Sequence, residues 1–198
     1  MLLSIWVLTY NRLPYLKLLL DSIFKSQILE NENVELIVIN NASTDETQQY
    51  LDKLDIQKNI KIFTRDFNLR GSGVVQDFLN LSSGKWIFSV GDDDICYSET
   101  LKKIPKILDS LNSLEVSLIP FAASTVDEEG AQTPIIYSPP IDTEQVDLLA
   151  KLINRSIYWL PATIFNRNLL SSERPTTITV FDWWLWLEGV ICGELLKS

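Results

Sequence analysis

KWIFSVGDDD, residues 85–94, joins an apolar run directly to three consecutive carboxylates. Aromatic and β-branched residues of this kind favour β-structure. Similar runs occur earlier, LLSIWVLT at 2–9, VELIVIN at 34–40 and the shorter NIKIFT at 59–64. Their apolar positions are nearly continuous, which is typical of strands buried on both faces of a parallel sheet.

The segments between these strands have the spacing of helices. YLKLLLDSIFKSQ, 15–27, places Leu16, Leu19, Leu20 and Ile23 on one side, and VVQDFLNL, 74–81, forms a shorter helix. Ser43 or Thr44 is expected to cap a further helix with acidic residues in its first turn. Alternating strands and helices predict an α/β fold, a mostly parallel sheet with helices on both faces.

The second half of the chain is less regular. It contains a helix at 98–111, bent or interrupted near Pro105, strands at 115–124 and 157–165, helices at 143–155 and 181–196, and turn-rich loops at 126–134 and 137–144. No composition shift marks a boundary, so we expect one domain over 1–198.

Composition excludes several classes of function. The chain has no histidine, which rules out His-dependent catalysis and His-ligated metal sites. Two cysteines, Cys96 and Cys192, are too few for a disulfide framework and are expected to be reduced. A net charge of −9 argues against a nucleic-acid partner.

No apolar run has the length of a membrane span and no signal peptide is recognisable, so we expect a cytoplasmic location.

Polar residues collect where the predicted strands end. The clusters are Thr9-Tyr10-Asn11, Asn40-Asn41, Thr64-Arg65-Asp66 and Asp92-Asp93-Asp94. Ligands of open α/β sheets bind beyond the carboxyl ends of the strands, so a single cleft is expected to collect these side chains.

The three carboxylates at 92–94 have two readings. Like charges this close raise one another's pKa unless a cation or hydrogen-bond donors compensate, and a hard divalent cation bound by oxygen ligands would do so. Alternatively the residues form a solvated turn before the helix at 98–111, since acidic residues favour helix starts. The residues alone leave both readings open.

Three segments, in order, resemble a known family. LTYNRLPYL at 8–16, ELIVINNASTDET at 35–47 and SSGKWIFSVGDDD at 82–94 are similar to family 2 inverting glycosyltransferases, which have the GT-A fold. The resemblance covers about the first hundred residues. It implies a nucleotide-sugar donor, most often UDP-linked, with residues 1–95 binding the donor and 96–198 the acceptor.

The resemblance also implies roles for single residues. Thr9 and Asn11 lie where the family's first loop meets the nucleotide, and Asn41, with Asn40 beside it, stands where the family has a carboxylate that reads the uracil base. The amides lack that charge, which leaves the identity of the base open. Asp92 is expected to contact the ribose and Asp93 a Mn²⁺ or Mg²⁺ ion, and Asp94 could share either task.

Asp182 is the candidate catalytic base. An inverting transfer needs a group to accept the proton of the acceptor hydroxyl, and without histidine a carboxylate is the natural choice. The resemblance places such an acid at the start of a late helix. Trp183 and Trp184 beside it could stack on an acceptor sugar or pack in a core. Asp182 could instead only stabilise a helix N-terminus, and Glu188 is a third choice for the base.

The resemblance implies that the acceptor is a glycan or lipid-linked glycan in surface polysaccharide biosynthesis. The expected cytoplasmic location leaves room for the enzyme to act at the inner face of a membrane. The tryptophan-rich segment keeps peripheral membrane association open, although it carries few cations. Two alternatives remain: a non-catalytic relative that only binds nucleotide sugars or glycans, and a sugar-phosphate nucleotidyltransferase. TYNRLP lacks the glycine-rich loop expected of the latter. The sequence does not predict an oligomeric state.

Overall fold

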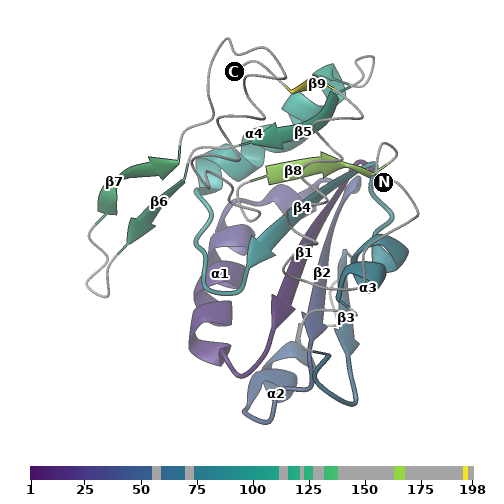
Figure 1. The fold of residues 1–198 in the computed structure, drawn as a ribbon, viewed down its shortest axis with the longest axis vertical. Coiled ribbons are helices and arrows are strands. Elements are labelled where there is room, and N and C mark those ends of the chain that lie inside the picture. The colour runs from purple at the N-terminus through teal and green to yellow at the C-terminus, as the bar shows by residue number, and fades with distance from the viewer. Residues whose placement is uncertain are drawn as a thin grey trace, which may run out of the picture. The chain divides into compact units, whose positions relative to one another are not determined.

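The computed structural model describes residues 1–54, 59–69, 74–111, 116–120, 123–126, 132–137, 163–167 and 194–195 (Figure 1). The chain separates into two compact units, Met1–Leu114 and Glu115–Ser198. Each unit is described by itself. Whether residues 1–95 and 96–198 serve donor and acceptor respectively stays a prediction.

The first unit is built on four parallel strands. They are β1 (Leu3–Thr9), β2 (Val34–Asn40), β3 (Ile60–Thr64) and β4 (Trp86–Gly91). Their order in the sheet is β3-β2-β1-β4, and every neighbouring pair is parallel. The chain therefore builds the sheet outward from β1 in one direction and then returns to its other side with β4. The predicted α/β fold with a parallel sheet is confirmed.

Helices connect these strands. They are α1 (Leu13–Lys25), the 3₁₀ turn η1 (Ile28–Glu30), α2 (Thr47–Leu51), α3 (Val74–Leu81) and α4 (Ser98–Ser110). In Figure 1, α1 and α3 flank the sheet from opposite sides, as right-handed crossovers to opposite sides of β1 require. Among the described helices, none has both the length and the apolar character needed to cross a membrane.

The core of this unit lies between the sheet and α1. Every residue of β2 is buried, and so is every residue of β1 except Leu8. Leu16, Leu19, Leu20 and Ile23 of α1 are fully buried, which confirms the predicted apolar side of this helix. Burying a side chain of this size stabilises the fold by about 1.5–3 kcal/mol relative to exposing it.

The amino ends of the strands carry a buried polar network around Glu35. The Ser4 hydroxyl donates to Glu35 Oε1 at 2.6 Å and the Ser83 backbone N–H donates to the same oxygen at 2.7 Å. Lys61 Nζ lies 2.6 Å from Glu35 Oε2. Burial alone would raise the pKa of Glu35, but these donors together lower it below its ordinary value. We call this set, with Gly84, the Glu35 network.

Gly84 lies where the main chain passes close to the main chain of β1 and β4. Its N–H donates to the Ser4 hydroxyl at 2.8 Å. A Cβ at this position would lie 2.6 Å from Ser4 N, 2.7 Å from Trp86 O and 2.8 Å from Leu3 C. All three are main-chain atoms, so only glycine fits without moving the strands.

The second unit contains two groups of paired strands in its described parts. β5 (Val116–Pro120) pairs antiparallel with β8 (Thr163–Asn166) and parallel with β9 (Glu194–Leu195). β6 (Ala123–Val126) and β7 (Gln132–Tyr137) form an antiparallel pair.

Several predicted boundaries are wrong. α4 continues through Pro105, so the expected interruption is wrong; the buried proline ring packs in the core and offsets a lost hydrogen bond. A bend near Pro105 stays a prediction. The strand expected at 115–124 is two strands that belong to different sheets. The loop expected at 126–134 begins in β6 and ends in β7. The helix expected through 196 is a strand at Glu194–Leu195, where pairing with β5 overrides the helical pattern.

Candidate functional site

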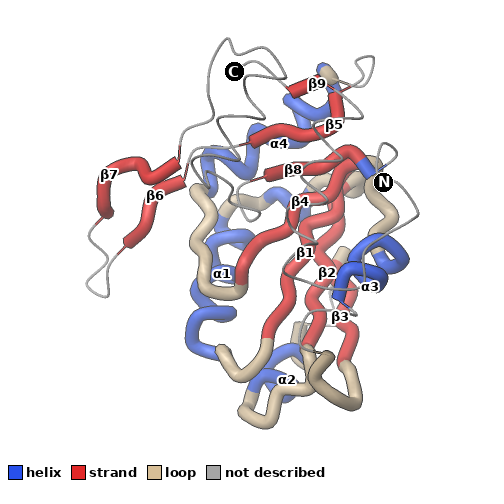
Figure 2. Tube along the Cα trace, in the orientation of Figure 1, coloured by secondary structure: helices blue, strands red, loops and turns tan. Residues whose placement is uncertain are grey.

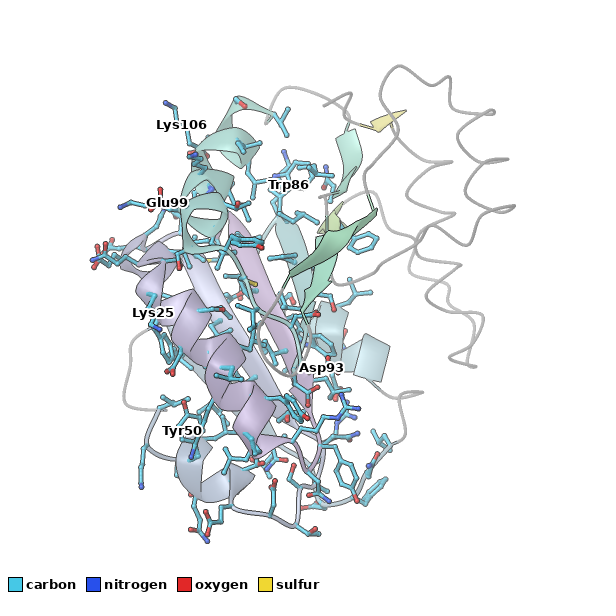
Figure 3. All side chains as sticks on the ribbon, turned by 90° about the vertical axis from the view of Figure 1, so that its left-hand side faces the viewer. Lys25, Tyr50, Trp86, Asp93, Glu99 and Lys106 are labelled. Atoms are coloured by element: carbon cyan, nitrogen blue, oxygen red, sulfur yellow. The ribbon has the colours of Figure 1, made fainter. Side chains whose placement is uncertain are left out.

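The strand order places a topological switch at β1. β2 lies on one side of β1 and β4 on the other, so the loops that follow these strands leave in different directions. A crevice at the carboxyl ends of such strands is the usual ligand site of an open α/β sheet. Figure 2 shows the loops after β1 and β2 in tan near α2, and Figure 3 shows Asp93 at the opposite end of β4 from Trp86.

Gly91–Asp94 forms a tight turn at the end of β4, which we call the acidic turn. The Asp94 N–H donates to the Gly91 carbonyl at 3.1 Å, and the Gly91 N–H donates to Asp94 Oδ2 at 2.9 Å. A Cβ on Gly91 would lie 2.8 Å from Asp94 Oδ2 and 3.0 Å from Asp93 Oδ1. Glycine therefore leaves room for the carboxylates to fold back over the strand end.

Arg12 joins the acidic turn to the loop after β1. Its Nη1 lies 3.3 Å from Asp92 Oδ1 and 2.8 Å from Asp93 Oδ2. The Asp92 side chain is 9% exposed, whereas those of Asp93 and Arg12 are 54% and 50% exposed. One carboxylate is thus part of the buried strand end, and the other faces outward with the guanidinium.

The pKa values of two carboxyls in the acidic turn are raised. Burial is the largest cause for both Asp92 and Asp94, and the charge of Asp93 adds to it. Arg12 and the Thr9 hydroxyl lower the pKa of Asp92 without cancelling that rise. The predicted rise is confirmed, but burial contributes more to it than repulsion among the three carboxylates does.

Asn11 ties the loop after β1 to the loop after β2. It has a positive φ of 55°, its N–H donates to Ser43 Oγ at 3.0 Å, and its Oδ1 accepts from the Thr44 N–H at 2.7 Å. Neither Ser43 nor Thr44 caps α2, so that prediction is wrong. Asp45 Oδ1 accepts from the Thr47 N–H instead, at 3.0 Å, because the loop residues are already held by Asn11.

Asn40, the last residue of β2, is buried and has local partners. Its Nδ2 donates to Gln48 Oε1 at 2.8 Å, and its Oδ1 accepts from the Ser43 N–H at 2.9 Å. These contacts fix the start of the loop that leads to α2. A direct role in binding a nucleotide stays a prediction for Asn40.

Asn41 lies next to the end of β1, with its N–H donating to the Thr9 carbonyl at 2.9 Å. Its side-chain amide is engaged on both sides. Nδ2 donates to Asn68 Oδ1 at 2.8 Å, while Oδ1 accepts from Arg65 Nη1 at 3.1 Å and from the Leu69 N–H at 3.2 Å. Reading a base through Oδ1 would require Asn41 to exchange one of these donors.

Arg65 pairs in turn with Asp77 of α3. The negative charge opposite this guanidinium therefore comes from α3, while residue 41 contributes an uncharged oxygen. A carboxylate at position 41, as the family resemblance implies, would place a further negative charge beside Arg65, where the amide places none.

The structure brings together six of the residues predicted to bind the nucleotide sugar. These are Thr9, Asn11, Asn40, Asn41, Asp92 and Asp93, all at the carboxyl ends of β1, β2 and β4. Asp182, Trp183 and Trp184 lie outside the described residues. Arg12 and Asp77 were missed as site residues, although Arg12 directly follows the first polar cluster, which is a signal the sequence contains.

Within the described ranges, no three Cys, Asp or Glu side chains gather closely enough to hold a metal by themselves. Asp92 and Asp93 do converge on one cationic nitrogen. Asp94 points one oxygen back to its own strand. Any metal here would take part of its coordination from a ligand or water, as Mg²⁺ at phosphate sites commonly does.

The chain is similar in sequence to known glycosyltransferases. Poly(ribitol-phosphate) beta-N-acetylglucosaminyltransferase TarS of Staphylococcus aureus is 32% identical over 111 residues, 56% of this chain and 19% of that protein. Abequosyltransferase RfbV of Salmonella typhimurium is 34% identical over 113 residues, again 56% of this chain and 33% of that protein. The chain spans a third or less of the length of these relatives.

Solved structures show the same fold. TarS 1–349 in complex with UDP-GlcNAc matches with a TM-score of 0.75 and 22% identity, over 100% of this chain and 56% of that one. The mannosyltransferase PcManGT from Pyrobaculum calidifontis, in complex with GDP-Man and Mn²⁺, matches with a TM-score of 0.67 and 15% identity, over 99% of this chain and 54% of that one. These likenesses confirm the GT-A fold. The family model for glycosyl transferase family 2 matches residues 4–172, and the chain therefore belongs to that family.

Proposed function

We propose that the chain is the catalytic domain, or part of it, of an inverting glycosyltransferase that takes a sugar from a nucleotide sugar. The observation that carries the proposal is the acidic turn at the topological switch, where Asp92 and Asp93 converge on a single cationic nitrogen. Family membership gives the class of reaction. The UDP-GlcNAc complex of TarS favours a UDP-linked donor.

A divalent cation, Mn²⁺ or Mg²⁺, fits the donor set of the acidic turn. Asp93 would supply an outward-facing oxygen, and Asp92 an oxygen 3.3 Å from the nitrogen that both residues share. Asp94 would bring only one oxygen, because the other accepts the Gly91 N–H. The cation would neutralise charge on the departing nucleoside diphosphate. The Mn²⁺ in the PcManGT complex supports this choice.

The chain's own residues would position the donor. Asn11 and Asn40 hold the loops after β1 and β2 at fixed distances, so that the nucleotide meets a preformed surface. The acceptor hydroxyl oxygen would bond to the anomeric carbon as the bond to the diphosphate breaks. Asp182 would accept the hydroxyl proton, and Trp183 and Trp184 would contact the acceptor sugar.

The acceptor we propose is a glycan or lipid-linked glycan of a surface polysaccharide, reached from the cytoplasmic face of a membrane. The names of TarS and RfbV support a role in this kind of biosynthesis. A non-catalytic relative that only binds is the second candidate, favoured by the amide at position 41 and its engaged oxygen.

A thermal-shift screen tests the proposal. UDP-sugars and GDP-sugars are added with Mn²⁺ and, separately, with EDTA, because a ligand that binds the folded state raises the melting temperature. We expect UDP-sugars to stabilise the chain only with metal. No shift with any nucleotide sugar would remove the proposed function, whereas a shift without sugar transfer to any acceptor would support the binding-only candidate.

Asp182→Asn separates catalysis from binding. Loss of a general base lowers the rate by about 10²–10⁴-fold and leaves donor affinity intact. The assay measures UDP-sugar affinity and sugar transfer on the same preparation. Glu188→Gln, the other candidate for the base, is measured beside it, with Asp109→Asn at an exposed position on α4 as the control. A collapse of donor affinity would place Asp182 in the donor site instead, and unchanged transfer would move the base elsewhere.

A further inference from the structure

Arg12 is the one cation that the described structure places against the acidic turn. A single nitrogen, Nη1, reaches two carboxylates of adjacent residues, 3.3 Å from Asp92 Oδ1 and 2.8 Å from Asp93 Oδ2. The two ends of the contact come from different strands, since Arg12 follows β1 and the carboxylates follow β4. A cationic nitrogen thus lies where two carboxylate oxygens converge.

The backbone of Arg12 is fixed, but its side chain can leave. Arg12 directly precedes α1, and its neighbours Asn11 and Leu13 are held by hydrogen bonds to Ser43 and Asp45. The side chain itself is half exposed and long, so it can rotate into water without disturbing the loop. The pair with Asp93 is exposed on both sides, and an exposed ion pair is weak enough to be exchanged for a stronger cation.

We propose that Arg12 is a tethered cation that neutralises Asp92 and Asp93 in the donor-free chain and is displaced when a divalent metal binds there. The role rests on the proposed function, because it concerns the metal of the same donor site. It makes Arg12 a positioning residue that competes with the metal. The alternative is a fixed bracket, in which Arg12 keeps its ion pairs and shapes the turn around the bound metal.

The two roles predict opposite effects of removing the charge. A competitor lowers the apparent affinity for metal in proportion to the fraction of molecules in which it occupies the carboxylates. Arg12→Gln should therefore tighten binding of Mn²⁺ alone, by about two- to fivefold for an exposed pair. A bracket holds the carboxylates together, so the same substitution should weaken binding of the metal.

Binding of Mn²⁺ alone is measured by the loss of the free Mn²⁺ signal in electron paramagnetic resonance. Wild type, Arg12→Gln and Arg12→Lys are compared with Lys25→Gln. That control removes the same charge from the other end of α1, about 20 Å away at 1.5 Å per residue, beyond the screening length at physiological salt. UDP is then titrated into each protein at saturating Mn²⁺.

We expect tighter Mn²⁺ binding by Arg12→Gln, and binding near the wild-type value by Arg12→Lys and Lys25→Gln. Unchanged or weaker binding by Arg12→Gln, with UDP still bound, overturns the role of Arg12 and leaves the proposed function standing. An equal gain by Lys25→Gln also overturns it, because the effect would then be one of net charge. Failure of every protein to bind Mn²⁺, with or without UDP, overturns both.

Discussion

At the two ends of the parallel strands β1–β4, the pKa values of buried and half-buried carboxyls are shifted in opposite directions. At the amino ends, Glu35 is buried but receives Ser4, Ser83 and Lys61, and its pKa is lowered. At the carboxyl ends, Asp92 is buried and Asp94 is half-buried, both have fewer donors, and their pKa values are raised. The Glu35 network is complete in itself, whereas the acidic turn is under-compensated.

That difference separates a structural carboxylate from one available to a ligand. A buried charge whose donors are all supplied by the fold stabilises the folded state and has little to gain from a cation. Carboxylates that remain under-compensated cost stability and gain from any cation that arrives. The acidic turn is therefore where we expect stability and function to oppose each other.

Two glycines give the largest contrast between the two ends. Gly84→Ala should lower the free energy of unfolding by about 3 kcal/mol, because its Cβ meets main-chain atoms that cannot move independently. Gly91→Ala should cost much less, because its Cβ meets only the ends of the Asp93 and Asp94 side chains. Urea unfolding of both variants measures the difference. Equal losses would mean that the acidic turn is as rigid as the Glu35 network.

Glu35→Gln should lower the free energy of unfolding by about 2 kcal/mol at pH 7, because Lys61 loses its anionic partner. Lys61 keeps its hydrogen bond to the Ser83 hydroxyl and is 43% exposed, so it can turn to water. The pKa of Glu35 is lower in the folded chain than in the unfolded one. Its contribution is therefore present at neutral pH and lost as the pH falls through the folded value.

Asp109→Asn, which removes the same charge from an exposed position on α4, is the control and should stay near wild type. Unfolding measured at pH 7 and near pH 4 should show the gap between wild type and Glu35→Gln closing in acid. A gap that widened in acid would contradict the lowered pKa.

Asp94→Asn should have a smaller effect of opposite sign, a rise of about 0.5–1 kcal/mol at pH 7, as is common when an unfavourable charge is removed. The asparagine Oδ1 can still accept the Gly91 N–H. The pKa of Asp94 is raised in the folded chain, so ionisation costs stability above that value and nothing below the ordinary one. Thermal melts should show the gain at neutral pH and its disappearance near pH 4. A loss of stability at pH 7 would show that the charge itself holds the turn.

The fold of the first unit could be predicted from the sequence because the apolar positions of its strands are nearly continuous. The residues of VELIVIN match β2 and those of VVQDFLNL match α3. In the second unit the patterns are shorter and pairing decides them. Glu194–Leu195 is a strand because it pairs with β5, which no local pattern in its surroundings reveals.

The site could be predicted only in part, for a related reason. Strand ends identify which residues gather, since parallel strands bring their carboxyl ends to one edge. They do not identify which side chains are already engaged. The Asn41 side-chain oxygen accepts from Arg65 and from the Leu69 N–H, and Arg12 contacts the acidic turn from 80 residues away. Only the three-dimensional structure reveals these contacts.

Calorimetric titration of UDP into the wild-type chain, with Mn²⁺ and with EDTA, tests most directly whether the acidic turn binds a nucleoside diphosphate through a metal. Asp93→Ala is measured beside it, with Asp109→Ala as the control. We predict that UDP binds the wild type and the control only with Mn²⁺, and that Asp93→Ala loses most of that affinity. UDP affinity that is the same in EDTA, or unchanged in Asp93→Ala, would contradict the account.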